Sequence, residues 1–558
     1  MGLDVLGISM SFLKTTLLCS ATTFVAAGSA QAADLPVRKA EPIEFVRVCG
    51  AYGAGFFYIP GTDTCLRISG RARFEAGYQP TYSRQAGTNN GDTTGYRGLL
   101  RINMDARTQT SYGTLRAFVR LEAGSRTGGP YGGGTSGTQQ RIGNAYAALG
   151  TDEFGRAQQY VNVDKAFIQF AGLTAGRASS FFDFYAHDFE FTGATAGSDV
   201  FSTNLIAYTA TFGNGFSATI SVEDPTARRS PVFSPLSTAA TVSNGSVQNF
   251  GLTNLPTPVF VNFNGRTPFT TSTVDVIQRN EMPDFVGALR LDQAWGSAQL
   301  SAASHQIDIG NLTNTTPTAG ATGLAHTQAA YGYAVQGGLK INAPFIAPGD
   351  AFYLQAAYAN GAQMYSGYCS YSGCYGQTAT TIEGQKFAQY FNDATVNPIT
   401  GQLQKSSNIT ASASYLHYWT PEWRSAFFGS YGEQNFAAGA RAGQGLIFAA
   451  TNGITGTNSF GTNAVGVPGT RFYQLSAALR DTYQFVAGAN IIWSPVKDLD
   501  IGLEGLYTQV GVKNGRVIDT DKDPTAYTRI SSINAGGFVR TTTSDGVEQI
   551  RIRIQRDF

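Results

Sequence analysis

Arginines recur at alternate positions in the early part of the chain, within residues 68–78, 96–108 and 115–122. The arginines that share this spacing are Arg71, Arg73, Arg101, Arg116 and Arg120. Successive side chains of a β-strand point to opposite faces, so extended segments would gather these guanidinium groups on one face. A wall of fixed cations beside water selects ions and solutes by charge. The simpler interpretation is that these arginines only solvate the face that carries them.

An acidic and aromatic segment follows residues 161–176, which we expect to form one strand. Its acidic side chains are Asp183, Asp188, Glu190 and Asp199. Phenylalanines are interleaved with them, at Phe181, Phe182, Phe184, Phe189 and Phe191. Carboxylates held opposite the arginines would set up a transverse field that orients dipolar solutes. Two alternatives are an aromatic-rich surface loop and an aromatic staircase of the kind that guides sugars.

Motifs for catalysis, metal binding or cofactor binding are missing from the sequence. The four histidines are His187, His305, His326 and His417, and none belongs to an HExxH motif. The sequence also contains no GxSxG elbow and no P-loop. We therefore predict a protein that is not an enzyme and that needs neither a metal nor a cofactor. A Ser/His site on a barrel wall stays open as a minor alternative.

The element that must position such charged faces is a strand, and the last segment shows its pattern most clearly. Ile550, Ile552, Ile554 and Phe558 alternate with polar or charged residues over residues 546–558. One face of this strand is therefore apolar and the other is charged, as in an outer-membrane β-barrel, whose strands touch lipid outside and water inside. A surface strand of a soluble sheet would have the same pattern, so the rest of the chain has to decide.

The composition favours a barrel over a set of soluble domains. Charged residues make up 14% of the 558 residues, against roughly 25% in soluble domains. Glycine (66), phenylalanine (37) and tyrosine (27) are abundant, yet the mean hydropathy is only −0.12. No stretch after the first segment has the roughly 20 apolar residues of a membrane-spanning helix. The net charge of +1 and the lack of a basic cluster argue against a nucleic-acid partner.

The first 32 residues have the features of a secretory signal peptide. Lys14 supplies positive charge, residues 17–27 are apolar, and the small residues around Ala32 predict cleavage between Ala32 and Ala33. Met10 is an alternative start to Met1. We expect residues 33–67 to form an N-terminal segment closed by a disulfide, and residues 68–558 to form the barrel.

The cysteines indicate an oxidising compartment. Besides Cys19 in the signal peptide, the chain has Cys49, Cys65, Cys369 and Cys374. An even number in a secreted chain predicts disulfides. Four cysteines allow three pairings. Their short separation along the sequence is the one argument that favours Cys49 with Cys65 and Cys369 with Cys374. A zinc site is a weaker alternative, because neither couple has CxxC spacing or a histidine nearby.

The connections between the alternating segments are of two lengths. Some are tight turns, such as residues 213–215, and tryptophans stand beside the turns near residues 419–423 and 493–498. Others are long and show no regular alternation of apolar and polar residues: residues 224–282, 310–324, 360–407, 435–470 and 511–545. Short periplasmic turns and long external loops alternate in outer-membrane barrels. We therefore predict an all-β, transmembrane antiparallel β-barrel of about 16 strands, with 18 possible.

Several segments resemble the alphaproteobacterial general porin family. They are residues 33–36 (ADLP), 52–70 (YGAGFFYIPGTDTCLRISG), 163–172 (VDKAFIQFAG) and the segment around residues 176–184. The final strand ending in Phe558 is similar as well. The likeness covers the N-terminal third and the last strands, whereas residues 224–282 and 360–407 look longer than that family's loops.

The resemblance implies a trimeric, 16-stranded porin in the bacterial outer membrane that lets small hydrophilic solutes and ions diffuse passively. It implies that the third external loop, around residues 183–199, folds inward to form the constriction. It also implies that Phe558 is the signal read by the barrel-assembly machinery. The expected partners are therefore outer-membrane lipid, that machinery, two further copies of the chain and the solutes themselves.

Two other functions remain open at this point, and a third is excluded. A substrate-selective channel, for sugars for example, would use the phenylalanines of residues 181–191. A surface adhesin would suit the Thr-, Asn- and Gly-rich composition but not the final strand. A TonB-dependent transporter needs a plug domain before the barrel, and strand patterning that begins near Ile68 leaves no room for one.

Overall fold

A computed structural model describes residues 47–78, 94–127, 158–185, 189–198, 202–233, 259–275, 277–310, 321–323, 328–368, 378–379, 386–452 and 464–558. The barrel belongs to the compact unit Cys49–Phe558. The predicted signal peptide and its cleavage site at Ala32 and Ala33 lie outside the described residues. The domain boundaries at residues 32 and 67 stay predictions.

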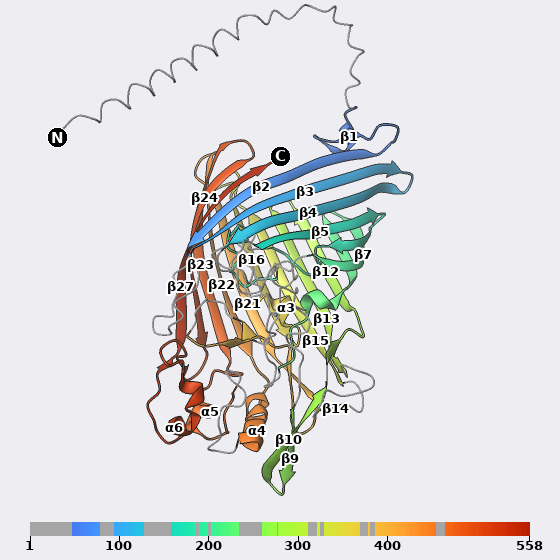
Figure 1. Ribbon diagram of the computed structural model, residues 1–558. Helices are drawn as coiled ribbons and strands as arrows, with labels where there is room; N and C mark the ends of the chain where they lie inside the picture. The colour runs from blue at the N-terminus through green and yellow to red at the C-terminus, as the bar shows by residue number, and fades with distance from the viewer. Residues whose placement is uncertain are drawn as a thin grey trace, which may run out of the picture. The chain divides into compact units, whose positions relative to one another are not determined.

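Sixteen of the described strands form a closed antiparallel barrel (Figure 1). They are β2 (Cys65–Tyr78), β3 (Thr94–Thr110), β4 (Gly113–Thr127), β5 (Gln158–Phe170), β6 (Leu173–Ala178), β7 (Thr203–Gly213), β8 (Phe216–Glu223), β12 (Asp284–Gln293), β13 (Gly296–Gly310), β15 (Gln328–Asn342), β16 (Ala351–Asn360), β21 (Ser407–Tyr418), β22 (Trp423–Asn435), β23 (Thr482–Val496), β24 (Leu499–Val512) and β27 (Ser544–Asp557). Each strand pairs with the next in this order, and β27 pairs with β2 to close the ring. The predicted all-β barrel of about 16 strands is confirmed.

Short elements lie outside this ring. The strands among them are β1 (Phe57–Tyr58), β9 (Val259–Asn264), β10 (Thr267–Asp275), β11 (Ile277–Arg279), β14 (Ala321–Gly323), β17 (Thr378–Ala379), β18 (Gln389–Tyr390), β19 (Ala394–Val396), β20 (Leu403–Lys405), β25 (Val517–Ile518) and β26 (Thr541–Thr542). The helices are η1 (Gly50–Tyr52), η2 (Pro225–Arg228), α3 (Gln363–Ser366), α4 (Ala440–Asn452), α5 (Arg471–Leu475), η4 (Ala526–Thr528) and α6 (Ile530–Asn534). None of these described helices is both long and apolar enough to cross a membrane.

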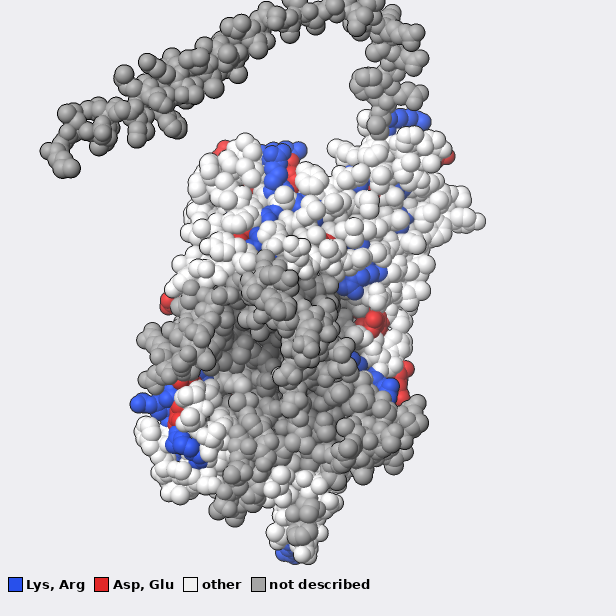
Figure 2. All heavy atoms as spheres, viewed as in Figure 1, with Lys and Arg blue, Asp and Glu red and all other residues white. Residues whose placement is uncertain are grey.

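Side-chain exposure alternates along β27 as the sequence predicts. Ile550 and Ile552 are 53% and 45% exposed on the outer face, whereas Arg551 between them is 3% exposed. Placing an arginine on the lipid face at the membrane midplane destabilises a barrel by about 2–4 kcal/mol. The charged face of β27 therefore points inward. On the face of the molecule in Figure 2, residues other than Lys, Arg, Asp and Glu predominate among the described ones.

Connections at one end of the barrel are short and those at the other end are long. The β7–β8 turn is tight because Asn214 and Gly215 adopt positive φ angles of 49° and 73°. A Cβ on Gly215 would lie 1.8 Å from the carbonyl oxygen of Asp292, so only glycine fits there. The long connections are residues 79–93, 128–157, 179–202, 224–283, 311–327, 361–406, 436–481 and 513–543. In outer-membrane barrels the long connections are external.

One strand prediction is wrong. Residues 161–176 do not form a single strand, because the chain turns at Ala171 and Gly172 and continues as β6. Both residues have positive φ angles, 49° and 87°. Alanine rarely adopts this conformation, so the sequence carried only the glycine as a turn signal.

The last two long connections fold onto each other beyond the barrel strands, as α4, α5 and α6 show in Figure 1. Their buried apolar side chains form one cluster that includes Phe448, Phe472, Ile530 and Ile533. We refer to this cluster and the helices around it as the loop cap.

Candidate functional site

The five predicted arginines all lie on the inner face of the wall, on β2, β3 and β4. Each of them has a hydrogen-bonding partner on the same or a neighbouring strand. The pairs are Arg71–Asp557 (2.6 Å), Arg73–Gln555 (2.9 Å), Arg101–Glu122 (2.8 Å), Arg116–Asp105 (2.9 Å) and Arg120–Asn103 (2.8 Å). The wall is therefore a ladder of arginines interleaved with carboxylates and amides, not an uninterrupted positive surface.

The strongest concentration of charge surrounds Glu75, which is 1% exposed. Its carboxylate accepts from Nε of Arg97 and from Nε of Arg553, each at 2.7 Å. Nη1 of Arg73 lies 3.7 Å away. One carboxylate thus serves three guanidinium groups, which leaves an excess of positive charge at this level of the lumen. The predicted set omitted Arg97 and Arg553, although both follow the same alternation as the arginines it contained.

Residues 179–202, which we call the inner loop, cross the inside of the barrel in their described part. The carbonyl oxygen of Phe182 accepts from Ser301 of β13 and from Gln336 of β15, both at 2.7 Å. Gln299 of β13 donates to the carbonyl oxygen of Phe181 at 3.1 Å. Because these donors lie on the inner face of the wall, the loop is fixed inside the barrel, as expected.

Further along, the inner loop is held by β24 and β27. Glu504 accepts from the backbone N–H of Phe191 at 2.5 Å and of Thr192 at 2.9 Å. Arg553 donates to the carbonyl oxygen of Phe191 at 2.8 Å, and its guanidinium lies 4.2 Å from the centre of that ring. A Cβ on Gly502 would meet the same ring at 2.5 Å, so a glycine in the wall makes room for it.

Two described carboxylates of the inner loop, Asp183 and Glu190, accept hydrogen bonds from groups outside the five-arginine wall. Asp183 accepts from Arg228 of η2 at 2.7 Å and from Ser198 at 2.5 Å, and the Asp183 and Arg228 side chains are both buried. Glu190 accepts from the backbone N–H groups of Ala194 and Thr195. A buried carboxylate has to be paired, and these contacts supply a partner for each of the two. Asp188 and Asp199 lie outside the described residues.

The Arg228–Asp183 contact is reinforced from a third long connection. The guanidinium of Arg228 lies 4.4 Å from the ring centre of Tyr365 in α3 and donates to Ser198 at 3.0 Å. Burial disfavours the charged guanidinium, but Asp183 and the neighbouring acidic groups outweigh it and raise the pKa of Arg228. The residue therefore stays charged and clamps the inner loop.

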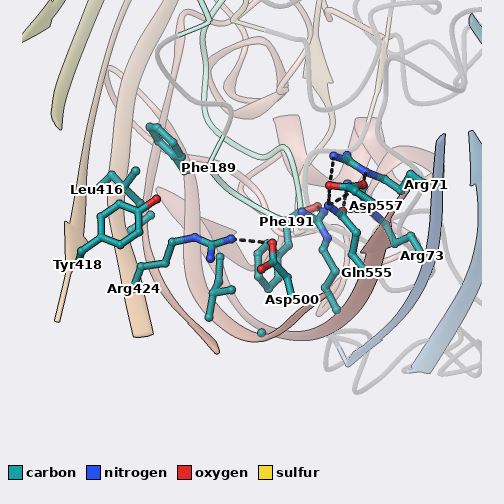
Figure 3. Close-up of a pocket in the computed structure, with 14 residues that line it drawn as sticks. Arg71, Arg73, Phe189, Phe191, Leu416, Tyr418, Arg424, Asp500, Gln555 and Asp557 are labelled. Carbon is teal, nitrogen blue, oxygen red and sulfur yellow. Dashed lines mark hydrogen bonds and ion pairs between the residues drawn. The ribbon is translucent and has the colours of Figure 1, made fainter. Parts of the chain in front are cut away.

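A cavity of about 330 Å³ opens beneath the inner loop, in the lumen (Figure 3). Its lining comes from the inner loop and from β2, β21, β22, β23, β24 and β27. The lining residues are Arg71, Arg73, Phe189, Phe191, Leu416, Tyr418, Arg424, Ala426, Ile492, Asp500, Gly502, Arg553, Gln555 and Asp557. Two arginines of the predicted wall thus reach the cavity, whereas Arg101, Arg116 and Arg120 lie elsewhere on the wall.

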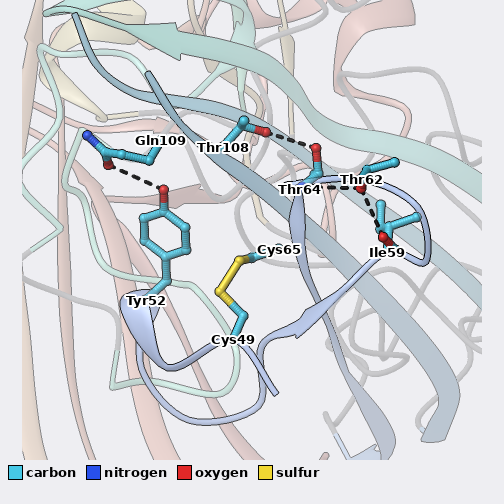
Figure 4. Close-up of a disulfide and its surroundings, with 8 residues drawn as sticks. All are labelled: Cys49, Tyr52, Ile59, Thr62, Thr64, Cys65, Thr108 and Gln109. Carbon is cyan, nitrogen blue, oxygen red and sulfur yellow. Dashed lines mark hydrogen bonds between the residues drawn. A yellow bond between two sulfur atoms is a disulfide. The ribbon is translucent and has the colours of Figure 1, made fainter. Parts of the chain in front are cut away.

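A disulfide joins Cys49 to Cys65 and closes the segment before β2 (Figure 4). Tyr52 and Thr64 of this segment bond to Gln109 and Thr108 of β3, at 3.4 and 2.9 Å. Cys369 and Cys374 lie outside the described residues, so their predicted pairing stays a prediction. In the described part of the chain, no group of three or more His, Cys, Asp or Glu side chains could hold a metal ion.

Phe558 completes the seam at which the barrel closes. Its backbone exchanges two hydrogen bonds with Gly70 of β2, at 2.8 and 3.0 Å. Its ring covers Gly70, where a Cβ would lie 2.4 Å from the ring. The ring is 60% exposed on the outer surface. Its predicted role as an assembly signal stays a prediction.

This combination of a sixteen-stranded barrel, a charged lumen and an inward loop defines an outer-membrane porin. Residues 34–535 match the family described as the Porin subfamily, and the chain belongs to it. The expected likeness to alphaproteobacterial porins is confirmed, and with it the place of the barrel in the outer membrane.

The particular relatives are porins of Brucella. The chain is 40% identical to porin Omp2b of Brucella suis biovar 1 over 220 residues, which are 38% of this chain and 54% of the relative. Omp2b of Brucella suis is 34% identical over 299 residues, 51% of this chain and 64% of the relative. The chain thus spans little more than half the length of the curated relatives it matches.

Among solved structures, the outer-membrane channel DcaP of Acinetobacter baumannii is 12% identical, with a TM-score of 0.47 over 90% of this chain and 99% of DcaP. OmpF of Salmonella typhi in complex with daunomycin is 13% identical, with a TM-score of 0.39 over 90% of this chain and 100% of OmpF.

Proposed function

We propose that this protein is a passive diffusion pore for small hydrophilic solutes and ions across the bacterial outer membrane, and not an enzyme. The observation that carries the proposal is the inner loop that crosses the inside of the barrel, with a cavity of about 330 Å³ lined by this loop and by the charged wall. A solute that passes the loop meets fixed guanidinium groups and apolar rings at this level. Passage then depends on size and charge.

The inner loop supports this function because it is anchored to several parts of the wall. Its backbone bonds to Gln336 of β15, Glu504 of β24 and Arg553 of β27. Such anchoring fixes the width of the constriction, so the pore needs no moving part to select by size. The arginine ladder supplies the charge that biases ions within the remaining space.

Liposome swelling tests the proposal directly. Proteoliposomes diluted into isotonic solutions of neutral sugars of increasing size should swell at rates that fall with the size of the sugar. Liposomes that contain heat-denatured protein are the control and should not swell. Rates equal to this control for the smallest sugars would contradict the pore function.

Membership of the porin family also supports a homotrimer that is inserted by the barrel-assembly machinery and surrounded by outer-membrane lipid. A substrate-selective channel is the second candidate, because Phe189 and Phe191 line the cavity. Swelling that is much faster for one sugar than for others of equal size would favour it over a general pore.

A further inference from the structure

The cavity beneath the inner loop carries more positive than negative charge. Four arginines line it: Arg71, Arg73, Arg424 and Arg553. Two aspartates, Asp500 and Asp557, also line it, so the formal charge of the lining is +2. The two aspartates stand on different sides of the cavity, each beside one arginine (Figure 3).

The hydrogen bonds show where the excess charge lies. Arg71 and Arg424 are each matched by one aspartate, Asp557 and Asp500, at 2.6 Å. Arg73 and Arg553 instead share Glu75, which Arg97 also contacts. Because Glu75 can neutralise only one of three guanidinium groups, the positive charge on the β2 and β27 side of the cavity is not balanced within this cluster.

Apart from Gln555 and Gly502, the remaining lining is apolar and partly aromatic. The side chains that share this property are Phe189, Phe191, Leu416, Tyr418, Ala426 and Ile492. The ring of Phe189 packs edge-on against Tyr353, with ring centres 4.9 Å apart, so it is held in place. A molecule in the cavity would therefore meet both guanidinium groups and aromatic rings, with Arg71 and Arg73 on the side away from Phe189 and Tyr418 (Figure 3).

We propose that this cavity is a binding subsite for small aromatic carboxylates. The carboxylate would accept charge-assisted hydrogen bonds from Arg73 and Arg553, and the ring would lie against Phe189 and Tyr418. A sugar fits less well, because its hydroxyl groups also need acceptors, and the carboxylates of the lining are already engaged by Arg71 and Arg424. The inference rests on the proposed pore function and adds to it the class of solute that the lumen retains.

The test is the current through single channels in a planar bilayer, recorded in potassium chloride with increasing concentrations of benzoate. We expect benzoate to block the chloride-carrying current at concentrations at least tenfold lower than acetate or glucose do. The open-channel conductance without benzoate reports the pore itself, so a failure of the subsite is distinguishable from a failure of the pore.

The variant Arg73→Gln should raise the half-blocking concentration of benzoate by about tenfold, the equivalent of one charge-assisted hydrogen bond. Phe189→Leu should raise it for benzoate but leave it unchanged for acetate, because acetate has no ring. Arg290→Gln is the matched control: Arg290 also faces the lumen, pairs with Asp292 at 2.9 Å and does not line the cavity. Heat-modifiable electrophoretic mobility checks that each variant is folded.

Three results would overturn the proposal. One is equal block by benzoate and acetate, which removes the contribution of the ring. Another is that the half-blocking concentration of benzoate is the same for the folded Arg73→Gln variant as for the wild type. The third is stronger block by glucose than by benzoate, which would assign the cavity to sugars instead.

Discussion

At the scale of single residues, glycines decide where large side chains can lie. Gly70 on β2 is covered by the ring of Phe558, and Gly502 on β24 by the ring of Phe191. Both glycines lie in strand interiors, where glycine is usually unfavourable. Here each one admits an aromatic ring at the barrel seam or at the constriction.

A single methyl group at the seam should therefore be costly. We expect Gly70→Ala to destabilise the barrel by about 1–3 kcal/mol, because its Cβ would overlap the ring of Phe558. Gly98→Ala is the matched control, since Gly98 faces outward on the adjacent β3 and a Cβ there meets nothing within 4 Å. The measurement is the temperature at which the folded electrophoretic mobility is lost. Equal temperatures for the two variants would show that the seam tolerates the methyl group.

At the scale of elements, the inner loop depends on other loops as well as on the wall. Arg228 of η2 bonds to the buried Asp183 and Ser198 of the inner loop. Tyr365 of α3 packs against Arg228 and against Phe182 of the same loop. Three long connections therefore meet at one buried ion pair. Losing one partner of such a pair leaves a buried charge without its counter-ion.

We expect Arg228→Gln to loosen the inner loop, at a local cost of about 3–5 kcal/mol. Current noise of single channels should increase, and amide hydrogen exchange in residues 179–198 should become faster. The control is the next residue: Arg229→Gln, because Arg229 bonds to Asn280 at the surface. If exchange in the inner loop is as slow in Arg228→Gln as in Arg229→Gln, the ion pair is not what holds the loop.

The disulfide before β2 offers a second prediction at this scale. Cys49→Ser together with Cys65→Ser should lower the free energy of unfolding by about 2–4 kcal/mol, because the loop between them is no longer closed in the unfolded chain. Thermal unfolding in detergent measures this, with and without a reductant. The reductant should lower the midpoint of the wild type and leave that of the double variant unchanged; no effect on either would contradict the assigned stabilisation.

At the scale of the whole molecule, the barrel and the loop cap have separate apolar packing. The barrel exposes its apolar side chains on its outer face, whereas the cap buries its own around Phe472, which is fully buried. Two regions built in this way can lose their structure independently.

We expect Phe472→Ala to destabilise the loop cap by about 3–5 kcal/mol and to leave the barrel folded. Limited proteolysis should then cut within residues 436–481 while the folded electrophoretic mobility is kept. Phe538→Ala is the control, because Phe538 belongs to the same end of the molecule but is 72% exposed. Loss of the folded mobility in Phe472→Ala would show that barrel and cap unfold together.

The sequence alone determined the features that depend on neighbours in the chain. The alternation in β27 assigned Ile550 and Arg551 to opposite faces. The two lengths of connection indicated a barrel, and the number of strand candidates predicted about 16 strands. The inward position of the wall arginines followed from the same period of two. The turn at Ala171 was missed, because the alternation of apolar and polar residues does not reveal a non-glycine residue with a positive φ angle.

Tertiary structure alone decided which charges meet. Asp183 was expected to face the arginine wall but pairs with Arg228, 45 positions away, and Glu75 meets Arg553 across 478 positions. The reason is physical: a buried charge takes whichever partner the closed barrel and the path of the loops bring within reach. The alternation of residues along a strand does not encode contacts between residues so far apart in the sequence. The cavity and its excess of positive charge therefore follow only from the closed ring of strands.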